Sequence, residues 1–223
     1  MLFSTPDFLL FFVIVIAVIS IIRYRKFQHI FLLIASYFFF YYSSNYLIVL
    51  LLLSVLLDYY IAKEIFDCKN LLRKKILLVI SLGVNLGLLG FFKYADFAID
   101  QFNIFGNYIN LSTEIPLLNL ALPIGISFYT FQTISYTVDV YRGQLTPSRS
   151  LREFALFVSF FPQLVAGPIV RAKDFLPQLR EKLEHSKNLS QLRLIVIKSG
   201  NFKLGITIMV FGFFKKLFFA DNI

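Results

Sequence analysis

Long apolar runs, separated by short polar segments, organise this chain. The runs lie at Phe8–Ile22, Ile30–Tyr42, Tyr46–Ala62, Ile76–Phe92, Leu122–Val140, Phe154–Val170 and Leu204–Phe219. Such runs predict helices within a lipid bilayer, because a helix satisfies its backbone hydrogen bonds within itself. Several runs are shorter than the roughly 20 residues that a straight span requires, so tilted helices and soft boundaries are expected. The pattern predicts an all-α fold, a polytopic transmembrane helical bundle.

Composition excludes a soluble domain. Hydrophobic residues make up 58% of the chain and charged residues 16%, whereas a soluble domain has about 45–50% apolar and about 25% charged residues. The formal net charge of +9 would suggest nucleic acid if the chain were soluble. Here the Lys and Arg residues gather in a few clusters between apolar runs, as in the cytoplasmic loops of membrane proteins. We therefore expect membrane lipids, and no nucleic acid, as partners.

The charge clusters also predict an orientation. Arg23–Lys26, Lys63–Lys75 and Arg171–Lys203 are basic, whereas Asp96–Ala121 holds acids and no Lys or Arg. Because Lys and Arg are in excess in cytoplasmic loops, the basic segments are expected inside and Asp96–Ala121 outside. No positive charge precedes the first apolar run, which favours a retained span over a cleaved signal peptide. The amino terminus is then expected outside.

The sixth run, Phe154–Val170, does not fit a simple alternation of spans. A full crossing there would place the basic Arg171–Lys203 segment outside. Pro162, Gly167 and Pro168 interrupt the run, and a broken helix at membrane depth is tolerated where it is buried in protein or lines a wet cavity. We expect this helix to be broken or re-entrant, entering and leaving on the same side.

Polar residues inside the fifth run carry the best functional signal. Tyr129, Gln132, Tyr136 and Asp139 fall on one stripe of a helix, at spacings of three and four. Burying such groups in lipid is costly, so they face a partner or a cavity. Two interpretations stay open. The stripe makes hydrogen bonds between helices, with Asp139 pairing with Arg142 near the inner interface, or it forms the wall of a substrate cavity.

Three other features have simpler interpretations. Gly83 and Gly87 form a Gly-x-x-x-Gly pattern, which permits close approach of a neighbouring helix. The aromatic cluster Tyr37–Tyr42 is typical of an outer interfacial belt. Asp58, near the end of the third run, is expected to be an interfacial acid rather than a proton carrier.

Templates for metal binding and nucleophilic catalysis are absent from the sequence. There is no His-Glu-x-x-His, no Gly-rich phosphate loop and no Gly-x-Ser-x-Gly, and the single Cys68 excludes an internal disulfide. His29 follows a basic loop and is expected to be an interfacial polar residue. His185 lies in a charged stretch and is expected on a solvated surface. We predict no metal site.

Three sequence blocks, taken in order, resemble a known family. The first is LPIGISFYTFQ at 122–132, followed by Ser135-Tyr136 and by DVYRG at 139–143; the others are FFPQLVAGPIVR at 160–171 and GFFKKLFFAD at 212–221. They are similar to blocks of the membrane-bound O-acyltransferase family, and in spacing to its bacterial branch that includes alginate O-acetyltransferase. The resemblance runs through the whole chain.

The resemblance implies transfer of an acyl group, usually acetyl, to a hydroxyl of a cell-envelope polysaccharide. It implies a multi-pass protein of the bacterial inner membrane with no bound cofactor, and a donor such as acetyl-CoA or an acyl carrier. Expected partners are a donor-delivering protein and the polymer, or a periplasmic or extracellular acyltransferase. The fifth and sixth runs would help to build a funnel around the reaction centre, with the candidate residues Tyr129, Gln132, Tyr136, Asp139, Gln163 and Arg171.

Acyl transfer also needs a base that takes the proton of the attacking hydroxyl, and histidine suits this near neutral pH. The family supplies this histidine from a tryptophan-rich block downstream of the motif at Lys215-Lys216. The chain has no Trp, and neither His29 nor His185 lies in a matching motif. We therefore assign no catalytic residue. Residues 1–223 are expected to form the amino-terminal part of one acyltransferase domain, truncated at the carboxyl end and inactive alone.

Two rival functions have other requirements. A transporter would explain the broken sixth helix and the polar residues, but it usually shows paired interrupted helices in two halves, and none is evident here. A non-catalytic scaffold that binds an acyl-delivery partner is the other alternative. A Trp-rich block with a histidine, encoded after Ile223, would favour the enzyme over both.

Overall fold

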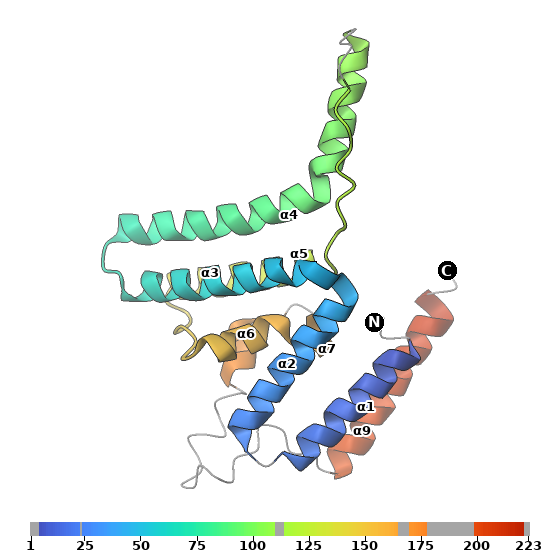
Figure 1. The fold of residues 1–223 in the computed structure, drawn as a ribbon. Coiled ribbons are helices and arrows are strands. Elements are labelled where there is room, and N and C mark those ends of the chain that lie inside the picture. Colours follow the sequence, from blue (N-terminus) through green and yellow to red (C-terminus); the bar gives the residue numbers. More distant parts are fainter. Residues whose placement is uncertain (1–4, 23, 110–113, 165–169, 178–198, 221–223) are drawn as a thin grey trace. The chain divides into compact units, whose positions relative to one another are not determined.

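The computed structural model describes residues 5–22, 24–109, 114–164, 170–177 and 199–220, and every regular element within them is a helix (Figure 1). The chain divides into two compact units. One combines residues 1–32 with 181–223, and the other spans 33–180. The predicted all-α fold is confirmed. Two helical stretches are long and apolar enough to cross a membrane, Lys26–Asp67 and Leu71–Tyr108, and two shorter apolar helices are Pro6–Ile21 and Gly200–Phe214.

The first unit holds α1 (Pro6–Ile21), the start of α2 (Arg25–Ser44), α9 (Ser199–Phe214) and the π-helical η3 (Lys215–Ala220). Thr5 caps α1, since its hydroxyl accepts from the Phe8 amide, and Pro6 takes the first turn, where no backbone donor is needed. At the other end, the Gln28 amide donates to the carbonyls of Ile19 and Ile22, at 3.0 and 3.1 Å. This side chain satisfies carbonyls at the end of α1 that have no partner within the helix.

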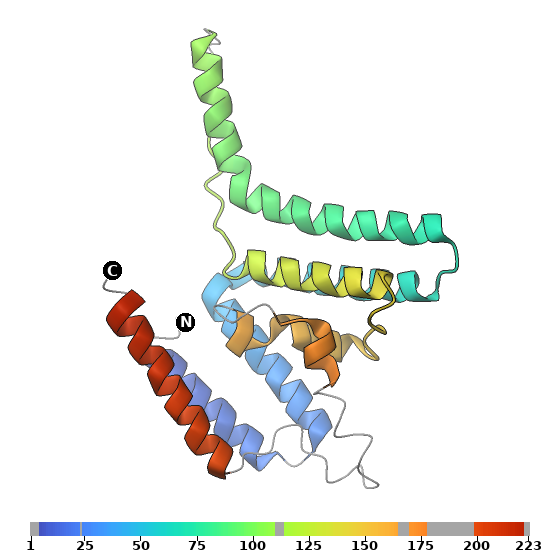
Figure 2. The same ribbon diagram turned by 180° about the vertical axis from the view of Figure 1, so that it is seen from behind.

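The second unit holds the rest of α2, the short η1 (Asn45–Leu47), α3 (Ile48–Asp67), α4 (Leu71–Tyr108), α5 (Ile126–Tyr141), α6 (Leu151–Ser159) and α7 (Phe161–Leu164), with one more helical stretch at 172–177. Helices α3, α4 and α5 pack against one another, and α6 packs on α3 and α5. Asn70 caps α4 and Ser150 caps α6 through their side-chain oxygens. The core of the unit therefore lies between α3, α5 and α6 (Figure 2).

Asp58 corrects one prediction. It is not an interfacial acid, because its side chain is fully buried where α3, α4 and α5 meet. The Ser81 hydroxyl and the Asn85 amide, both on α4, donate to its two carboxyl oxygens, the latter at 2.8 Å. Thr133 on α5 in turn donates to the Asn85 side-chain oxygen at 3.4 Å. A polar network inside the protein therefore joins the three helices.

Two expectations about helix surfaces also change. A Cβ atom on Gly83 or Gly87 would meet no described atom within 4 Å, so within the described residues the pair makes no close helix contact. The cluster Tyr37–Tyr42 is not a purely interfacial belt. Phe39 and Phe40 are buried, with their rings against Phe161 and Tyr129, while the side chains of Phe38, Tyr41 and Tyr42 are exposed.

Helix α4 is longer than the apolar run from which it was predicted. It continues through the acidic positions Asp96 and Asp100 to Tyr108. In both views it bends, and its last part turns away across the direction of α3 and α5 (Figures 1 and 2). Residues 114–122 return beside it without regular structure, held by hydrogen bonds from Asn103 to Ile115 and from Leu118 to Asp96.

Candidate functional site

The predicted stripe on α5 is buried. Tyr129, Gln132, Tyr136 and Asp139 are each exposed by 6% or less. Gly125 immediately precedes α5, and its φ of +76° lies in the left-handed region that glycine adopts without steric cost. A Cβ atom there would lie 2.6 Å from the Leu164 carbonyl oxygen at the end of α7. Glycine therefore allows both the entry into α5 and the close approach of α7.

Helices α6 and α7 run antiparallel along α5 in a fixed register. Gly125 meets Leu164, the Gln132 amide donates to the Phe157 carbonyl at 2.9 Å, and the Tyr136 ring lies 4.4 Å from that of Phe154. Residue numbers therefore rise along α5 while those of the contacting residues fall along α7 and α6. The stripe on α5 therefore lies along the broken sixth run.

The break in the sixth run is confirmed, and it lies at Phe160. Helix α6 ends at Ser159 and α7 begins at Phe161, with Pro162 in its first turn, where the missing N–H costs nothing. Gly167 and Pro168 lie outside the described residues. So does the rest of the predicted return, and re-entrance stays a prediction.

Two side chains from other helices satisfy the backbone groups at this break. In a continuous helix, the Phe161 amide would donate to the Phe157 carbonyl. Here the Phe161 amide donates to the Ser36 hydroxyl of α2 at 3.2 Å, while the Phe157 carbonyl accepts from Gln132 of α5. Buried backbone groups need partners, and the break is stable because Ser36 and Gln132 supply them. Sequence reasoning missed Ser36, although a polar residue isolated within an apolar run is the same signal that singled out Gln132.

Several buried polar atoms along this seam have no hydrogen-bond partner among the described residues. They are Gln132 Oε1 and Asp139 Oδ2 on α5, and Gln163 Nε2 on α7. Such atoms are costly to leave unpaired, and they suit a site that water or substrate occupies. The expected pairing of Asp139 with Arg142 is wrong, because no ion pair joins these two described residues. Gln132 thus supports both interpretations, since its amide nitrogen bonds to another helix while its oxygen remains available.

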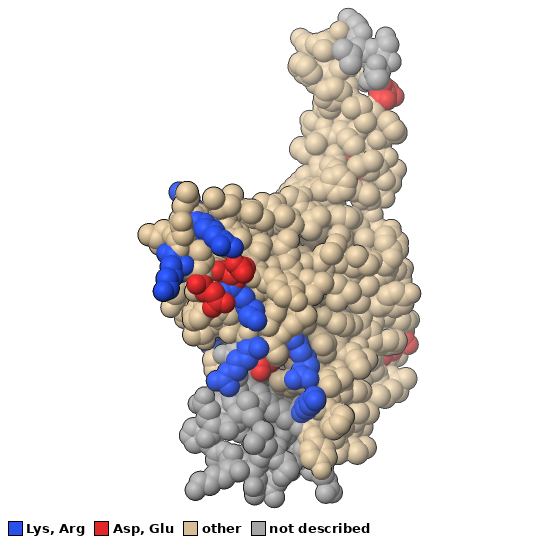
Figure 3. Space-filling view, turned by 60° about the vertical axis from the view of Figure 1, so that its left-hand side comes forward, with Lys and Arg blue, Asp and Glu red and all other residues tan. Residues whose placement is uncertain are grey.

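The carboxyl-terminal part of the stripe is joined to a hollow. The Tyr136 hydroxyl accepts from the Ser148 backbone amide at 2.9 Å. Ser148 also lines a hollow of about 350 Å³, together with Lys63, Phe66, Asp67, Thr146, Pro147 and Arg149. Lys and Arg side chains outnumber the acids that lie among them on the face shown in Figure 3. The end of the bundle formed by the α3–α4 turn and the α5–α6 loop, here called the basic end, is therefore cationic and hollowed.

Arg171, His29 and His185 remain to be located, and Arg171 precedes a helix whose Phe175 ring lies against those of Phe157 and Phe160 at the break. Arg171 is exposed, and its carbonyl accepts from the amides of Asp174 and Phe175 at the start of the helix at 172–177. His29 is buried in α2, not interfacial as expected, and His185 lies outside the described residues. No cluster of three or more His, Cys, Asp or Glu side chains suited to a metal occurs in the described part of the chain.

Comparison with known proteins matches this sequence to one family. Residues 142–223 match the model of the membrane-bound O-acyltransferase family. A probable alginate O-acetylase of Pseudomonas putida is 40% identical over 146 residues, which cover 66% of this chain and 27% of the relative. A peptidoglycan O-acetyltransferase of Helicobacter pylori is 33% identical over 193 residues, 76% of this chain and 34% of the relative.

The chain thus spans about a quarter to a third of the length of these curated relatives. No solved structure matched it. The family match covers the α5–α6 loop, α6, α7 and α9, and the matches to the relatives extend over two thirds or more of the chain. The chain belongs to the membrane-bound O-acyltransferase family.

Proposed function

We propose that the protein transfers an acyl group, acetyl in the first instance, to hydroxyls of a cell-envelope polysaccharide. The names of the relatives support this substrate class, because one is a probable alginate O-acetylase and another a peptidoglycan O-acetyltransferase. In this reaction the hydroxyl oxygen attacks the carbonyl carbon of the donor, the bond to the donor's leaving group breaks, and a base removes the hydroxyl proton. We assign the base to no residue of this chain.

The observation that carries the proposal is the seam between α5 and the broken sixth run. Gln132 fixes the break through the Phe157 carbonyl, and its Oε1, together with Gln163 Nε2, lacks a partner among the described residues. Amide groups held on packed helices can orient a polar substrate, because their own positions are fixed by the fold. We propose that this seam forms one wall of the acyl-transfer funnel.

The acyl donor, acetyl-CoA or an acyl carrier, is proposed to approach from the basic end. Lys63 and Arg149 line the hollow there, and cations favour a donor that carries phosphate. The Ser148–Tyr136 hydrogen bond joins this hollow to the stripe on α5. The polymer, or a periplasmic or extracellular acyltransferase partner, would then be reached from the opposite end.

The location that we propose is the bacterial inner membrane, crossed several times with the amino terminus outside. The support is the distribution of charge. The basic residues of the α3–α4 turn and the α5–α6 loop lie at one end, whereas the segment beyond Asp96 is acidic. Cytoplasmic loops carry the excess of Lys and Arg, and this supports a location of the basic end inside.

The test is Gln132→Leu in the protein expressed from its complete gene. We expect acyl transfer to polymer, per molecule of protein in the membrane, to fall by about tenfold or more, which corresponds to about 1.4 kcal/mol of lost transition-state stabilisation. Polymer acetylation and membrane abundance are measured together. Gln144→Leu is the matched control, because Gln144 is exposed in the loop after α5, and only its backbone amide bonds to Asp139.

Ser36→Ala separates packing from function. It removes the other side chain that supports the break, but it leaves the amide of Gln132 in place. If Ser36→Ala and Gln132→Leu lower abundance and specific activity in equal proportion, Gln132 acts by packing alone and the funnel wall is refuted. A loss of specific activity in Gln132→Leu only supports the proposal.

A further inference from the structure

The length of α4 does not match a single crossing of a membrane. Its 38 residues rise about 57 Å at about 1.5 Å per residue, nearly twice the roughly 30 Å of the hydrocarbon core. Its buried residues are Ser81, Asn85 and Leu89, and then Gly106. The stretch from Leu71 to about Leu89 therefore packs in the bundle and is long enough for one crossing. The remainder needs another location.

The remainder forms an arm, defined here as α4 from Asp96 to Tyr108 together with the returning segment 114–122. Figures 1 and 2 show the arm leaving the bundle crosswise to α3 and α5. It starts at the end of the bundle opposite to the basic end, where the Ser44 hydroxyl accepts from the Ile124 amide beside the start of α5. If α3 and α5 cross the bilayer, a crosswise arm runs along the membrane surface.

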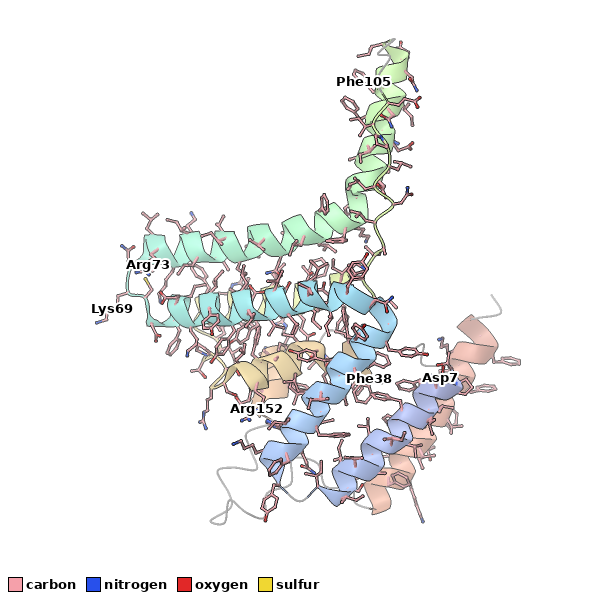
Figure 4. The ribbon with its side chains drawn as sticks, viewed as in Figure 1. Asp7, Phe38, Lys69, Arg73, Phe105 and Arg152 are labelled. Atoms are coloured by element: carbon pink, nitrogen blue, oxygen red, sulfur yellow. The ribbon has the colours of Figure 1, made fainter. Side chains whose placement is uncertain are left out.

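The side chains of the arm exclude a fully aqueous location. Phe97, Phe105 and Tyr108 are 64%, 59% and 86% exposed, and the returning segment exposes Ile115 and Leu118. Figure 4 shows Phe105 near the far end of the arm, distant from the packed part of α4. The arm carries acids but no Lys or Arg. Its exposed apolar residues occur both on α4 and on the returning segment 114–122. Aromatic side chains concentrate where the bilayer meets water.

The backbone of the arm is incompatible with a location in the hydrocarbon core. The Asn103 side chain accepts from the Ile115 amide at 2.9 Å and donates to the Ile115 carbonyl at 2.8 Å. Asp96 accepts from the Leu118 amide at 2.7 Å. For the amides of Leu117, Asn119 and Leu120 the described residues supply no partner. An irregular segment with unpaired amides is not tolerated in lipid hydrocarbon, so these amides must reach water.

From these opposing constraints we infer that the arm lies in the membrane–water interface, as an in-plane hairpin whose aromatic side chains enter the lipid. Its partner is the bilayer surface. This inference depends on the membrane insertion of the bundle and not on acyl transfer. An interfacial segment buries its apolar face about 5–10 Å below the headgroup boundary, which gives the location a measurable depth.

The experiment measures depth by spin labelling in the complete protein, reconstituted in phosphatidylcholine–phosphatidylglycerol vesicles after native cysteines, Cys68 included, are replaced by serine. Single cysteines replace Phe105, Val79 and Lys69, and the accessibility of each label to oxygen and to a water-soluble nickel chelate is compared. Val79 is as exposed as Phe105, at 59%, and lies on the packed part of α4. Lys69 lies in the α3–α4 turn (Figure 4).

We expect the Phe105→Cys label to lie about 5–10 Å below the phosphates, between the deep Val79→Cys label and the aqueous Lys69→Cys label. A Phe105 label as accessible to nickel as that at Lys69 would overturn the inference, and so would one as deep as that at Val79. A strongly immobilised label that neither reagent reaches would also overturn it, since a protein surface would then cover the arm. Phe97→Cys provides a second position, and it must give the same depth.

Discussion

At the scale of single residues, Asp58 is the centre of the hydrogen-bond network that joins α3, α4 and α5. Its carboxylate accepts from Ser81 and Asn85 across helices, so removing it strands two buried donors. Each stranded donor costs about 1–3 kcal/mol. We expect Asp58→Leu to lower the thermal stability of the detergent-solubilised protein markedly, measured by the loss of its monodisperse peak after heating.

Asp67 provides the control for this substitution. It is an exposed acid at the end of the same helix, and Asp67→Leu is expected to leave the stability nearly unchanged, as surface substitutions usually do. Equal losses for the two variants would mean that the network around Asp58 does not hold the bundle together.

Replacing Gly125 by alanine would have two costs, backbone strain at positive φ and a steric clash, and the same substitution at Gly143 separates them. Both Gly125 and Gly143 have positive φ, +76° and +71°, but a Cβ atom would touch the Leu164 carbonyl oxygen only at Gly125. A positive φ costs an L-residue about 1–2 kcal/mol. Gly143→Ala should lose about that much stability, while Gly125→Ala should lose clearly more, because the end of α7 must also shift. Thermal unfolding of both variants checks this, and similar losses would contradict the close approach of α7.

At the scale of elements, Tyr136 fastens the α5–α6 loop to α5. Its hydroxyl accepts from the Ser148 amide, and its ring packs on Phe154. Tyr136→Phe keeps the ring and removes the hydroxyl, so the loop should open more often while the helices remain packed. We expect amide hydrogen exchange at residues 143–150 to accelerate by about tenfold, which corresponds to about 1.4 kcal/mol. Tyr41→Phe, at an exposed position on α2, is the control and should leave this exchange unchanged.

Much of the element order followed from the sequence. The apolar runs predicted α1, α2, α3, α5 and the break near Pro162, because both lipid exposure and helix termination are local properties. The end of α4 was missed, since its acids suggested a loop although none of them breaks a helix. The stripe on α5 was found from its spacing. The partners of Asp58, by contrast, lie 23 and 27 positions away along the chain, and no local pattern indicates contacts of that kind.

At the scale of the whole molecule, the orientation in the membrane is the property to test. With Cys68 replaced, Lys187→Cys should resist a membrane-impermeant thiol reagent in intact cells and react once the cells are opened, because Arg171–Lys203 is expected inside. Lys187 itself lies outside the described residues. An Asn107→Cys variant, at an exposed position of the arm, should react in intact cells. Labelling of Lys187→Cys from outside would show that the sixth run crosses the membrane completely.

The break at Phe160 has a consequence for movement within the bilayer. Its donor and acceptor, the Phe161 amide and the Phe157 carbonyl, are held by side chains on two different helices, α2 and α5. A continuous helix would pair these two groups with each other in one hydrogen bond, in place of the two bonds that the break makes, and it would put Pro162 in a helix interior, where the ring clashes with the preceding turn. Straightening would also take these partners from the Gln132 amide and the Ser36 hydroxyl, both of which are buried. The bend at Phe160 should therefore stay rigid while α2 and α5 remain packed beside it.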